Sequence, residues 1–331
     1  MAGSKGERAI KREQKRVEKE KRKRIEAANK MLIPVPKATR ESLGLIAFDP
    51  GGTFRFVGNR WIRVYRMRRE KRMENDQPLT SILKNVTSKA RITKEVAGTI
   101  SNFHEGDTFL TLTASGETYD EVRTQFAKDE EALKGQISLT ELAVDDVMNL
   151  IRAGESSDFS YASMVRGKKD WKKECFSKIT AESGHFFLDS NYGECCFCLQ
   201  YPYELSAGAL KSLRELATPV LVCMDFAAVG ISENLDFNRT MEQKYNRRLG
   251  NGATDKEYMN ASFHLLFTCD SDDARKIIEK TILAIFGGAG FILAPSIGTQ
   301  KETAESLLSL GLFERQVMRN VPCEVLDQIR M

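Results

Sequence analysis

The stretch that decides the fold runs from His185 to Ala227 and reads HFFLDSNYGECCFCLQYPYELSAGALKSLRELATPVLVCMDFA. It begins with two short apolar runs, His185–Leu188 and Cys195–Leu199, which predict two strands. The residues between them, from Asp189 to Gly193, are typical of a turn. Tyr201-Pro202 ends the second strand, because proline donates no hydrogen bond to a ladder.

The remainder of this stretch predicts a helix and a third strand. Ser206 can cap a helix whose apolar residues lie three positions apart, at Leu210, Leu213 and Leu216. Pro219 closes that helix, and the apolar run Val220–Phe226 is typical of a strand covered on both faces. We expect this strand–helix–strand unit to be a core of the fold.

Composition indicates a large globular body with a basic tail. A chain of 331 residues is sufficient for two or three domains. Residues 1–40 carry 14 Lys/Arg and 5 Glu, a net charge of +9, which leaves −5 for the remainder of a chain whose total is +4. The charged N-terminus lacks the apolar segment of a signal peptide, and no stretch approaches the roughly 20 apolar residues of a membrane span. Seven cysteines, an odd number, favour a reducing cytoplasm.

The basic segment, residues 5–30, is rich in helix formers and poor in apolar residues, so we expect either an exposed helix or a disordered tail. Its charges suit anionic lipid or nucleic-acid phosphates, although aromatic residues that could stack on bases are absent. A solvated helix with neither partner is an equally weighted alternative. The candidate contact residues are Lys11, Arg12, Lys15, Arg16, Lys19, Lys21, Arg22, Lys23 and Arg24.

We predict four segments: a basic tail and linker (1–38), a first α/β subdomain (39–154), a polar linker (155–173) and a second α/β subdomain (174–331). In the first subdomain we expect a hairpin across Gly58-Asn59. Further strands and helices are predicted at Pro78–Ser88 (helix), Arg91–Val96 (strand), Phe109–Ala114 (strand), Tyr119–Lys134 (helix) and Leu139–Ala153 (helix).

The second subdomain predicts a ferredoxin-like split βαβ layer with a helix inserted between its repeats. The inserted helix is Ser232–Leu249, and the strand Ala261–Thr268 follows it. A helix capped at Ser271 or Asp272 then extends to Phe286, with Ile277, Ile278, Ile282 and Ile285 as its apolar stripe. A strand at Gly290–Leu293 and a last helix at Thr299–Leu310 complete it. FLTLTA followed by ETYDEVRTQF in the first subdomain parallels FHLLFT followed by DSDDARKIIEK here, which indicates two related layers.

No motif predicts a catalytic, cofactor or metal site. No phosphate loop occurs, and the cluster Gly287-Gly288-Ala289-Gly290 joins a helix to a strand, the reverse of a phosphate cradle. Asp225 ends an apolar strand as the magnesium ligand of nucleotide hydrolases does, but more simply marks the solvent end of that strand. Cys195 and Cys198 have metal-type spacing, yet strand alternation puts them on opposite faces. The histidines His104, His185 and His264 are scattered.

The order of these elements resembles a known family. The runs DSNYGECCFCLQYPYELSAGALKSLRELATPVLVCMDF, ASFHLLFTCDSDDARKIIEKTILAIFGGAGFILAP, ETAESLLSLGL, ESLGLIAFDPGGTFRFVGNRWIRVYRM and DTFLTLTASGETYDEVRTQF are similar to the N-terminal region of the large type IV secretion and conjugation ATPases, the CagE/TrbE/VirB class. The resemblance covers roughly Thr39 to Gly311. In that family a RecA-like motor follows this region, and this chain ends at Met331 without its nucleotide motifs.

The resemblance implies a non-enzymatic adaptor that docks on membrane subunits and on ATPase copies, with self-association and hydrolysis by another chain. We therefore expect an assembly component of a conjugative type IV secretion apparatus, cytoplasmic and peripheral to the inner face of the membrane. The basic tail would supply the membrane contact. The alternative is a nucleic-acid-binding accessory protein of DNA transfer that uses the same tail. An enzyme of unrecognised type is a third possibility.

Overall fold

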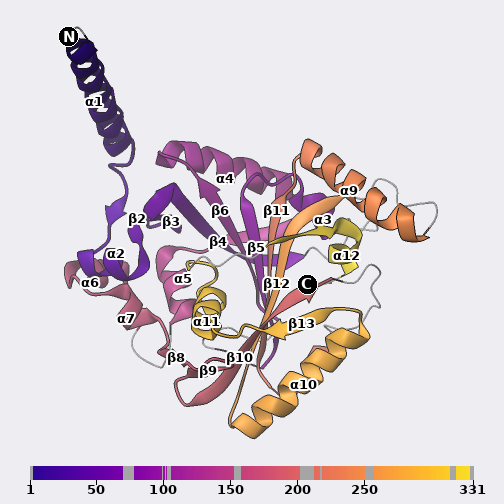
Figure 1. The fold of residues 1–331 in the computed structure, drawn as a ribbon. Coiled ribbons are helices and arrows are strands. Elements are labelled where there is room, and N and C mark those ends of the chain that lie inside the picture. Colours follow the sequence, from indigo (N-terminus) through magenta and orange to yellow (C-terminus); the bar gives the residue numbers. More distant parts are fainter. Residues whose placement is uncertain are drawn as a thin grey trace.

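The protein has an α+β fold in which helices cover both faces of one large antiparallel sheet (Figure 1). The computed structural model describes residues 3–69, 78–98, 100, 102, 106–152, 158–201, 212–216, 218–249, 257–313 and 318–328. The helices are α1 (Gly3–Ala28), α2 (Lys37–Leu43), α3 (Leu79–Leu83), α4 (Tyr119–Leu133), α5 (Val144–Ile151), α6 (Tyr161–Arg166), α7 (Trp171–Cys175), α9 (Ile231–Leu249), α10 (Asp272–Gly288), α11 (Gln300–Leu308) and α12 (Cys323–Gln328), with a 3-10 turn at Val57–Asn59.

The described strands form a single 14-stranded sheet. They are β1 (Ile33–Pro34), β2 (Leu45–Asp49), β3 (Thr53–Phe56), β4 (Arg60–Arg69), β5 (Lys89–Ala97), β6 (Thr108–Ser115), β7 (Ile137–Glu141), β8 (Ile179–Ala181), β9 (Phe186–Leu188), β10 (Asn191–Gln200), β11 (Val220–Ala228), β12 (Tyr258–Cys269), β13 (Ile292–Pro295) and β14 (Arg319–Pro322). The main path is β1-β2-β3-β4-β6-β5-β11-β12-β10-β9-β8, while β7, β13 and β14 pair with β4, β10 and β12.

Two groups of four strands follow the same order. We call β4 to β7 with α4 the first unit, and β10 to β13 with α10 the second unit. The first unit has the order β7-β4-β6-β5, and the second has β13-β10-β12-β11. Numbered along the chain, both read fourth, first, third, second. The sequence parallel between FLTLTA–ETYDEVRTQF and FHLLFT–DSDDARKIIEK falls on β6 with α4 and on β12 with α10, which hold the same place in the two units.

The two units share one sheet, because β5 pairs antiparallel with β11 along most of its length. Short strands extend the correspondence: β3 pairs with the first half of β4, and β9 pairs with the first half of β10. One helix also follows each unit directly, α5 after β7 and α11 after β13. Although the sequence predicts two subdomains, their described strands form one continuous sheet.

A separate hydrophobic core lies on each face of this sheet. One core contains residues of α3, α4, α10 and α12, and the other contains residues of α5, α7 and α11. Figure 1 shows α5 and α11 on one side of the strands and α10 and α12 on the other. Strand β11 contributes Val220, Val222 and Met224 to the first core, and Leu221 and Cys223 to the second. The prediction of a strand covered on both faces is therefore confirmed.

The helices of the two units begin at the residues that the sequence marks as caps. The Thr118 side chain accepts a hydrogen bond from the Glu121 N–H, and the Glu121 carboxylate accepts one in return from the Thr118 N–H, which is a full capping box at α4. Ser271 caps α10 by accepting from the Ala274 N–H at 3.2 Å. The predicted apolar stripe of α10 is partly wrong, because Ile277 is 66% exposed.

Several helix and strand boundaries predicted from the sequence are wrong, because they depend on strand pairing that a local pattern does not show. The helix predicted over Leu139–Ala153 is instead strand β7 followed by α5. Residues 137–141 form a strand because they pair antiparallel with β4. Strand β14 and helix α12 follow the last predicted helix. Most of the helix predicted from Ser206 lies outside the described residues.

Both predicted linkers are packed against the body where the structure describes them. The end of the first, within the predicted segment 1–38, contains β1 and the start of α2, and it buries Leu32 and Val35. The second, 155–173, contains α6 and the start of α7. There the fully buried Trp171 ring lies 5.2 Å from Phe48 and 5.1 Å from Phe159. Leu32, Val35 and Trp171 thus attach these segments to the body, whereas Met31 remains 60% exposed.

Candidate functional site

Helix α1 carries all nine predicted contact residues, and each of them is exposed. Successive residues of an α-helix are about 100° apart, so seven of the nine fall within an arc of about 140°. These seven form what we call the basic stripe: Lys11, Arg12, Lys15, Arg16, Lys19, Arg22 and Lys23. Lys21 and Arg24 lie off the stripe. The structure thus selects the helical alternative for the described part of the tail and gives its charge a direction.

Few of these cations are neutralised. Arg16 pairs with Glu13 at 2.8 Å and Arg22 with Glu26 at 3.0 Å, both exposed pairs within the helix. Such pairs contribute little and leave the charges accessible. The other five stripe residues form no ion pair with the described part of the chain. The stripe is therefore a linear array of available positive charge.

The end of α1 is fixed to the body beside α4. The buried Asn29 side chain accepts a hydrogen bond from the Tyr119 N–H at 2.8 Å and donates one to the Glu117 carbonyl at 3.1 Å. Lys21 adds an ion pair with Glu117 at 2.6 Å, and this hydrogen bond raises the pKa of Lys21. From this anchor α1 projects away from the sheet (Figure 1). No sequence signal identifies Asn29 as the anchor, since its partners lie about ninety residues away.

The described side of α1 opposite the stripe carries two exposed apolar side chains, Ile10 and Val17, which are 60% and 55% exposed. A surface that binds the stripe would leave them uncovered. With so few apolar residues on this side, its burial in a lipid interface would contribute little.

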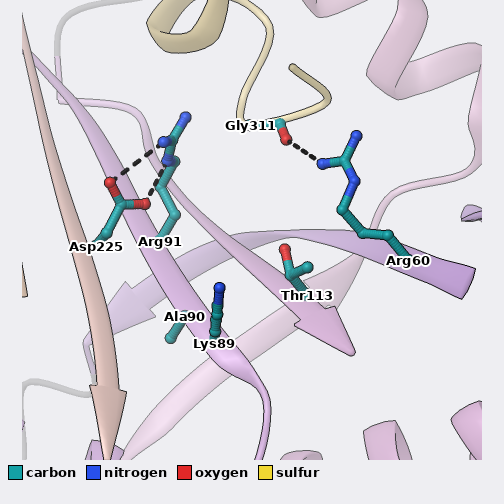
Figure 2. Close-up of a pocket in the computed structure, with 7 residues that line it drawn as sticks. All are labelled: Arg60, Lys89, Ala90, Arg91, Thr113, Asp225 and Gly311. Atoms are coloured by element: carbon teal, nitrogen blue, oxygen red, sulfur yellow. Dashed lines mark hydrogen bonds and ion pairs between the residues drawn. The ribbon is translucent and has the colours of Figure 1, made fainter. Parts of the chain in front are cut away.

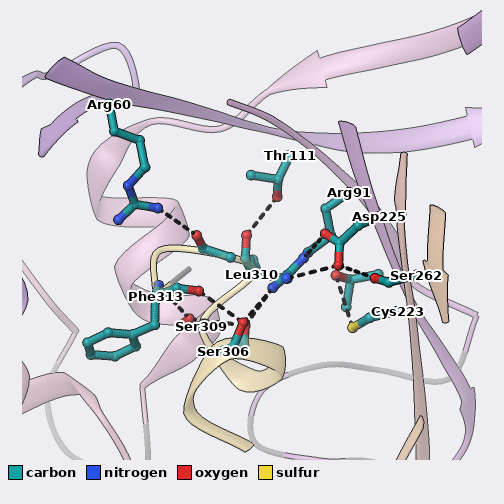
Figure 3. A network of polar contacts seen from close by, with 12 residues as sticks. Arg60, Arg91, Thr111, Cys223, Asp225, Ser262, Ser306, Ser309, Leu310 and Phe313 are labelled. Atoms are coloured by element: carbon teal, nitrogen blue, oxygen red, sulfur yellow. Dashed lines mark hydrogen bonds and ion pairs between the residues drawn. The ribbon is translucent and has the colours of Figure 1, made fainter. Parts of the chain in front are cut away.

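A second polar cluster lies buried where the two units join (Figure 3). Arg91 of β5 and Asp225 of β11 are directly opposed across the strand pair. The Arg91 guanidinium contacts both carboxylate oxygens of Asp225, at 2.6 and 3.2 Å, and the two side chains are only 5% and 1% exposed. Ser262 of β12 donates a further hydrogen bond to Asp225 at 2.7 Å. A bidentate pair of this kind is geometrically specific as well as strong.

Helix α11 and the loop after it attach to the first unit through the same cluster. Arg91 donates to the carbonyl and hydroxyl oxygens of Ser306, at 2.9 and 3.0 Å. Thr111 of β6 donates to the Leu310 carbonyl at 2.8 Å, and Arg60 of β4 donates to the Leu312 carbonyl at 2.8 Å. A cavity of about 10 Å³ remains between Arg60, Arg91 and Asp225 (Figure 2), room for about one water. This cluster is suited to joining the units rather than to binding a substrate.

The interpretation of Asp225 as the solvent end of a strand is wrong. β11 continues to Ala228, so Asp225 lies within the strand and is fully buried. Its two carboxylate oxygens accept hydrogen bonds from Arg91 and Ser262. The sequence could not show this pair, because 134 residues separate the partners.

The cysteine run lies where alternation predicts. Cys195 belongs to the core beside α11, and Cys198 belongs to the core on the opposite face. Burial raises the pKa of the Cys198 thiol to about 12 and that of Cys196 well above its usual value, so both are held as thiols. Within the described ranges no three His, Cys, Asp or Glu side chains gather as a metal site would require. His104 lies outside those ranges.

One buried acid has an unusual titration. Glu194 of β10 is fully buried, and its carboxylate contacts Arg275 of α10. Burial, followed by the neighbouring charge of Glu279, raises the pKa of Glu194 to about 7, against the opposing effect of Arg275. Glu194 contacts Cys196 and Arg275 of α10, so we assign it to the packing of α10.

No family model matches the chain, and no curated protein is significantly similar to it in sequence. Among the helices in the described ranges, none combines the length and apolar character needed to cross a membrane.

Proposed function

We propose that this protein is a non-catalytic docking component of a conjugative type IV secretion apparatus, built from two ferredoxin-like units. The fold part of the proposal is supported by strand direction. Since β4 and β5 both run antiparallel to β6, they are parallel to each other with one strand between them, as a split βαβ arrangement requires. β10 and β11 have the same relation across β12.

The functional part rests on one observation, the projecting helix α1 with its basic stripe. A net charge of +9 on residues 1–40, beside −5 on the remainder, concentrates attraction to anionic surfaces in this arm. Each Lys or Arg near an anionic membrane contributes about 1 kcal/mol. The arm would hold the protein at the inner face of the cell membrane, while the body docks on membrane subunits and on copies of the ATPase. ATP hydrolysis would belong to another chain.

Flotation with anionic vesicles tests the membrane contact. The variant Lys11→Gln, Lys15→Gln, Lys19→Gln removes three charges from the stripe. The matched control Lys128→Gln, Lys280→Gln, Lys301→Gln removes three exposed charges from α4, α10 and α11. We expect the control to float as the wild type does and the stripe variant to remain in the dense fraction. Equal flotation of the two variants would contradict the role of α1.

The linear shape of the stripe favours one alternative, an accessory protein that binds nucleic acid. From Lys11 to Lys23 the stripe extends about 18 Å along the helix, a length that can follow several phosphates of one strand. This function predicts duplex or single-stranded DNA affinity that falls steeply with salt and is lost in the stripe variant. Fluorescence anisotropy at several salt concentrations measures it. Such binding without flotation would favour this alternative over the membrane role.

A further inference from the structure

A groove lies at the outer edge of the first unit, between α4 and β7. Its volume is about 290 Å³. Ala127 of α4 and Ile137 and Leu139 of β7 supply apolar walls. Around them lie three carboxylates and one cation, from Glu130, Glu131, Glu141 and Lys134. Nothing in the sequence marked this groove, because the segment that forms β7 was predicted to be helical.

The far edge of β7 pairs with no other described strand. Alternate N–H and C=O groups of an edge strand point outward and can pair with an added strand. Proteins commonly protect such edges with proline, lysine or a bulge, and β7 reads Ile-Ser-Leu-Thr-Glu with none of these. A free edge beside a groove is the geometry that binds extended peptides by strand addition.

The side of the groove is held in place by buried partners. Tyr65 is fully buried and donates a hydrogen bond to Glu130 at 2.6 Å, and Arg63 contacts the same carboxylate at 2.9 Å. Glu131 and Glu141 are more accessible, with side chains 72% and 51% exposed. Among the described residues, Glu131 pairs with Lys134 at 3.1 Å and Glu141 with Arg63 at 3.5 Å. One carboxylate is therefore fixed while two can meet an incoming cation.

The equivalent place in the second unit is closed. There Phe286 of α10 packs against Phe263 and Phe291, with ring centroids 5.3 and 5.4 Å apart, and Phe291 leads into β13. β13 also ends at Pro295, which cannot donate to an added strand. The same topology thus leaves a groove in the first unit and fills it with aromatic rings in the second.

We propose that the first unit binds an extended segment of a partner protein, which adds to β7 as an edge strand. The segment would place an apolar side chain in the groove and a Lys or Arg beside Glu131 and Glu141. The alternation of side chains along a strand allows both, with the cation next in line on the same face. A second copy of this chain pairing through its own β7 would bring the same glutamates together, so a basic partner segment fits better. This site is separate from α1 and does not depend on its contact.

The test uses the full chain and a fluorescent decapeptide, Val-Thr-Lys-Thr-Val-Thr-Lys-Thr-Val-Thr, in which Val and Lys alternate along one face of the strand. Two comparison peptides have Glu in place of Lys, or Pro at two central positions to prevent strand pairing. We expect anisotropy to detect binding of the Val-Lys peptide alone, and hydrogen exchange of residues 137–141 to slow when it binds. Binding of the proline peptide with equal affinity would overturn the proposal, because strand addition requires the backbone donors. Absence of binding by the Val-Lys peptide would overturn it as well.

Two variants locate the site. Ala127→Trp fills the groove from an exposed helical position, so the core is not disturbed, and we expect affinity to fall by about tenfold or more. Glu131→Lys reverses a rim charge, and its matched control is Glu41→Lys on α2. We expect only the Glu131 change to weaken binding. Unchanged affinity in both groove variants would overturn the proposal. The Lys11, Lys15, Lys19 variant should bind the peptide normally, which separates this result from the test of α1.

Discussion

The two units of this protein share a topology but differ in what their edges do. In both, the fourth strand flanks the first, and a long helix after the third strand covers the same face of the sheet. The first unit leaves a groove between α4 and β7, whereas the second closes the same place with Phe286 and Phe291. The comparison teaches that the shared core sets the architecture, while the residues at the outer edges decide whether a unit can accept a partner.

At their inner edges, β5 and β11, the two units are joined to each other. β5 and β11 pair along most of their length, and the Arg91–Asp225 contact lies buried within that pair. A sheet built from two four-stranded units would otherwise expose two edges at its centre. Joining them leaves one sheet with cores on both faces.

Breaking the junction should have the largest effect. Asp225→Ala leaves Arg91 buried without its carboxylate, and we expect a loss of about 3–5 kcal/mol in the free energy of unfolding. Urea denaturation measures it. The double variant Arg91→Met, Asp225→Leu removes both charges and should be much closer to wild type. A single variant no less stable than the double variant would contradict the assignment.

A smaller effect on stability comes from the titration of Glu194, a residue of the second unit, and depends on pH. Burial raises the pKa of Glu194 from its usual 4.5 to about 7, so the folded state binds this proton more tightly than the unfolded state. The resulting stability is complete below about pH 4.5 and is lost as pH rises through 7. One pKa unit corresponds to about 1.4 kcal/mol, so the change is on the order of 3 kcal/mol at most. Glu194→Gln should flatten the dependence of Tm on pH between 5 and 7.5. An unchanged slope would show that the pH dependence of stability comes from another group.

The caps provide the finest comparison of the two units. Thr118→Ala and Ser271→Ala remove equivalent N-cap side chains from α4 and α10, and each should cost about 1 kcal/mol. We expect the larger loss for Thr118, because its capping box is reciprocal. Thermal unfolding of both variants, with Thr118→Ser as a conservative control, measures the difference. A larger loss at Ser271 would show that the cap at α10 matters more than the capping box.

Local patterns predicted the elements whose signal lies within their own residues. The apolar run Val220–Phe226 identified β11, and the helix predicted at Tyr119–Lys134 is α4. The basic residues of α1 were found because charge runs are visible without a fold. Even there, the sequence did not show that seven of these residues share one side of the helix, because this depends on the segment being helical.

The remaining features depend on contacts between distant residues. Leu139 was predicted to lie in a helix, but it belongs to β7 because that segment pairs with β4. Arg91 and Asp225 are 134 residues apart, and nothing local distinguishes them from exposed charges. The groove of the first unit depends on β7 and was missed with it. Tertiary pairing decides such positions, and a single sequence does not contain it.

Native-state hydrogen exchange tests most directly whether the two units form one sheet. Residues of β5 and β11 are measured separately, in the wild type and in Asp225→Ala. We predict that both strands exchange only by global unfolding, with the same free energy, and that the variant lowers both values equally. Two distinct free energies in the wild type, or a loss confined to one strand, would show that the units unfold independently and would contradict the account.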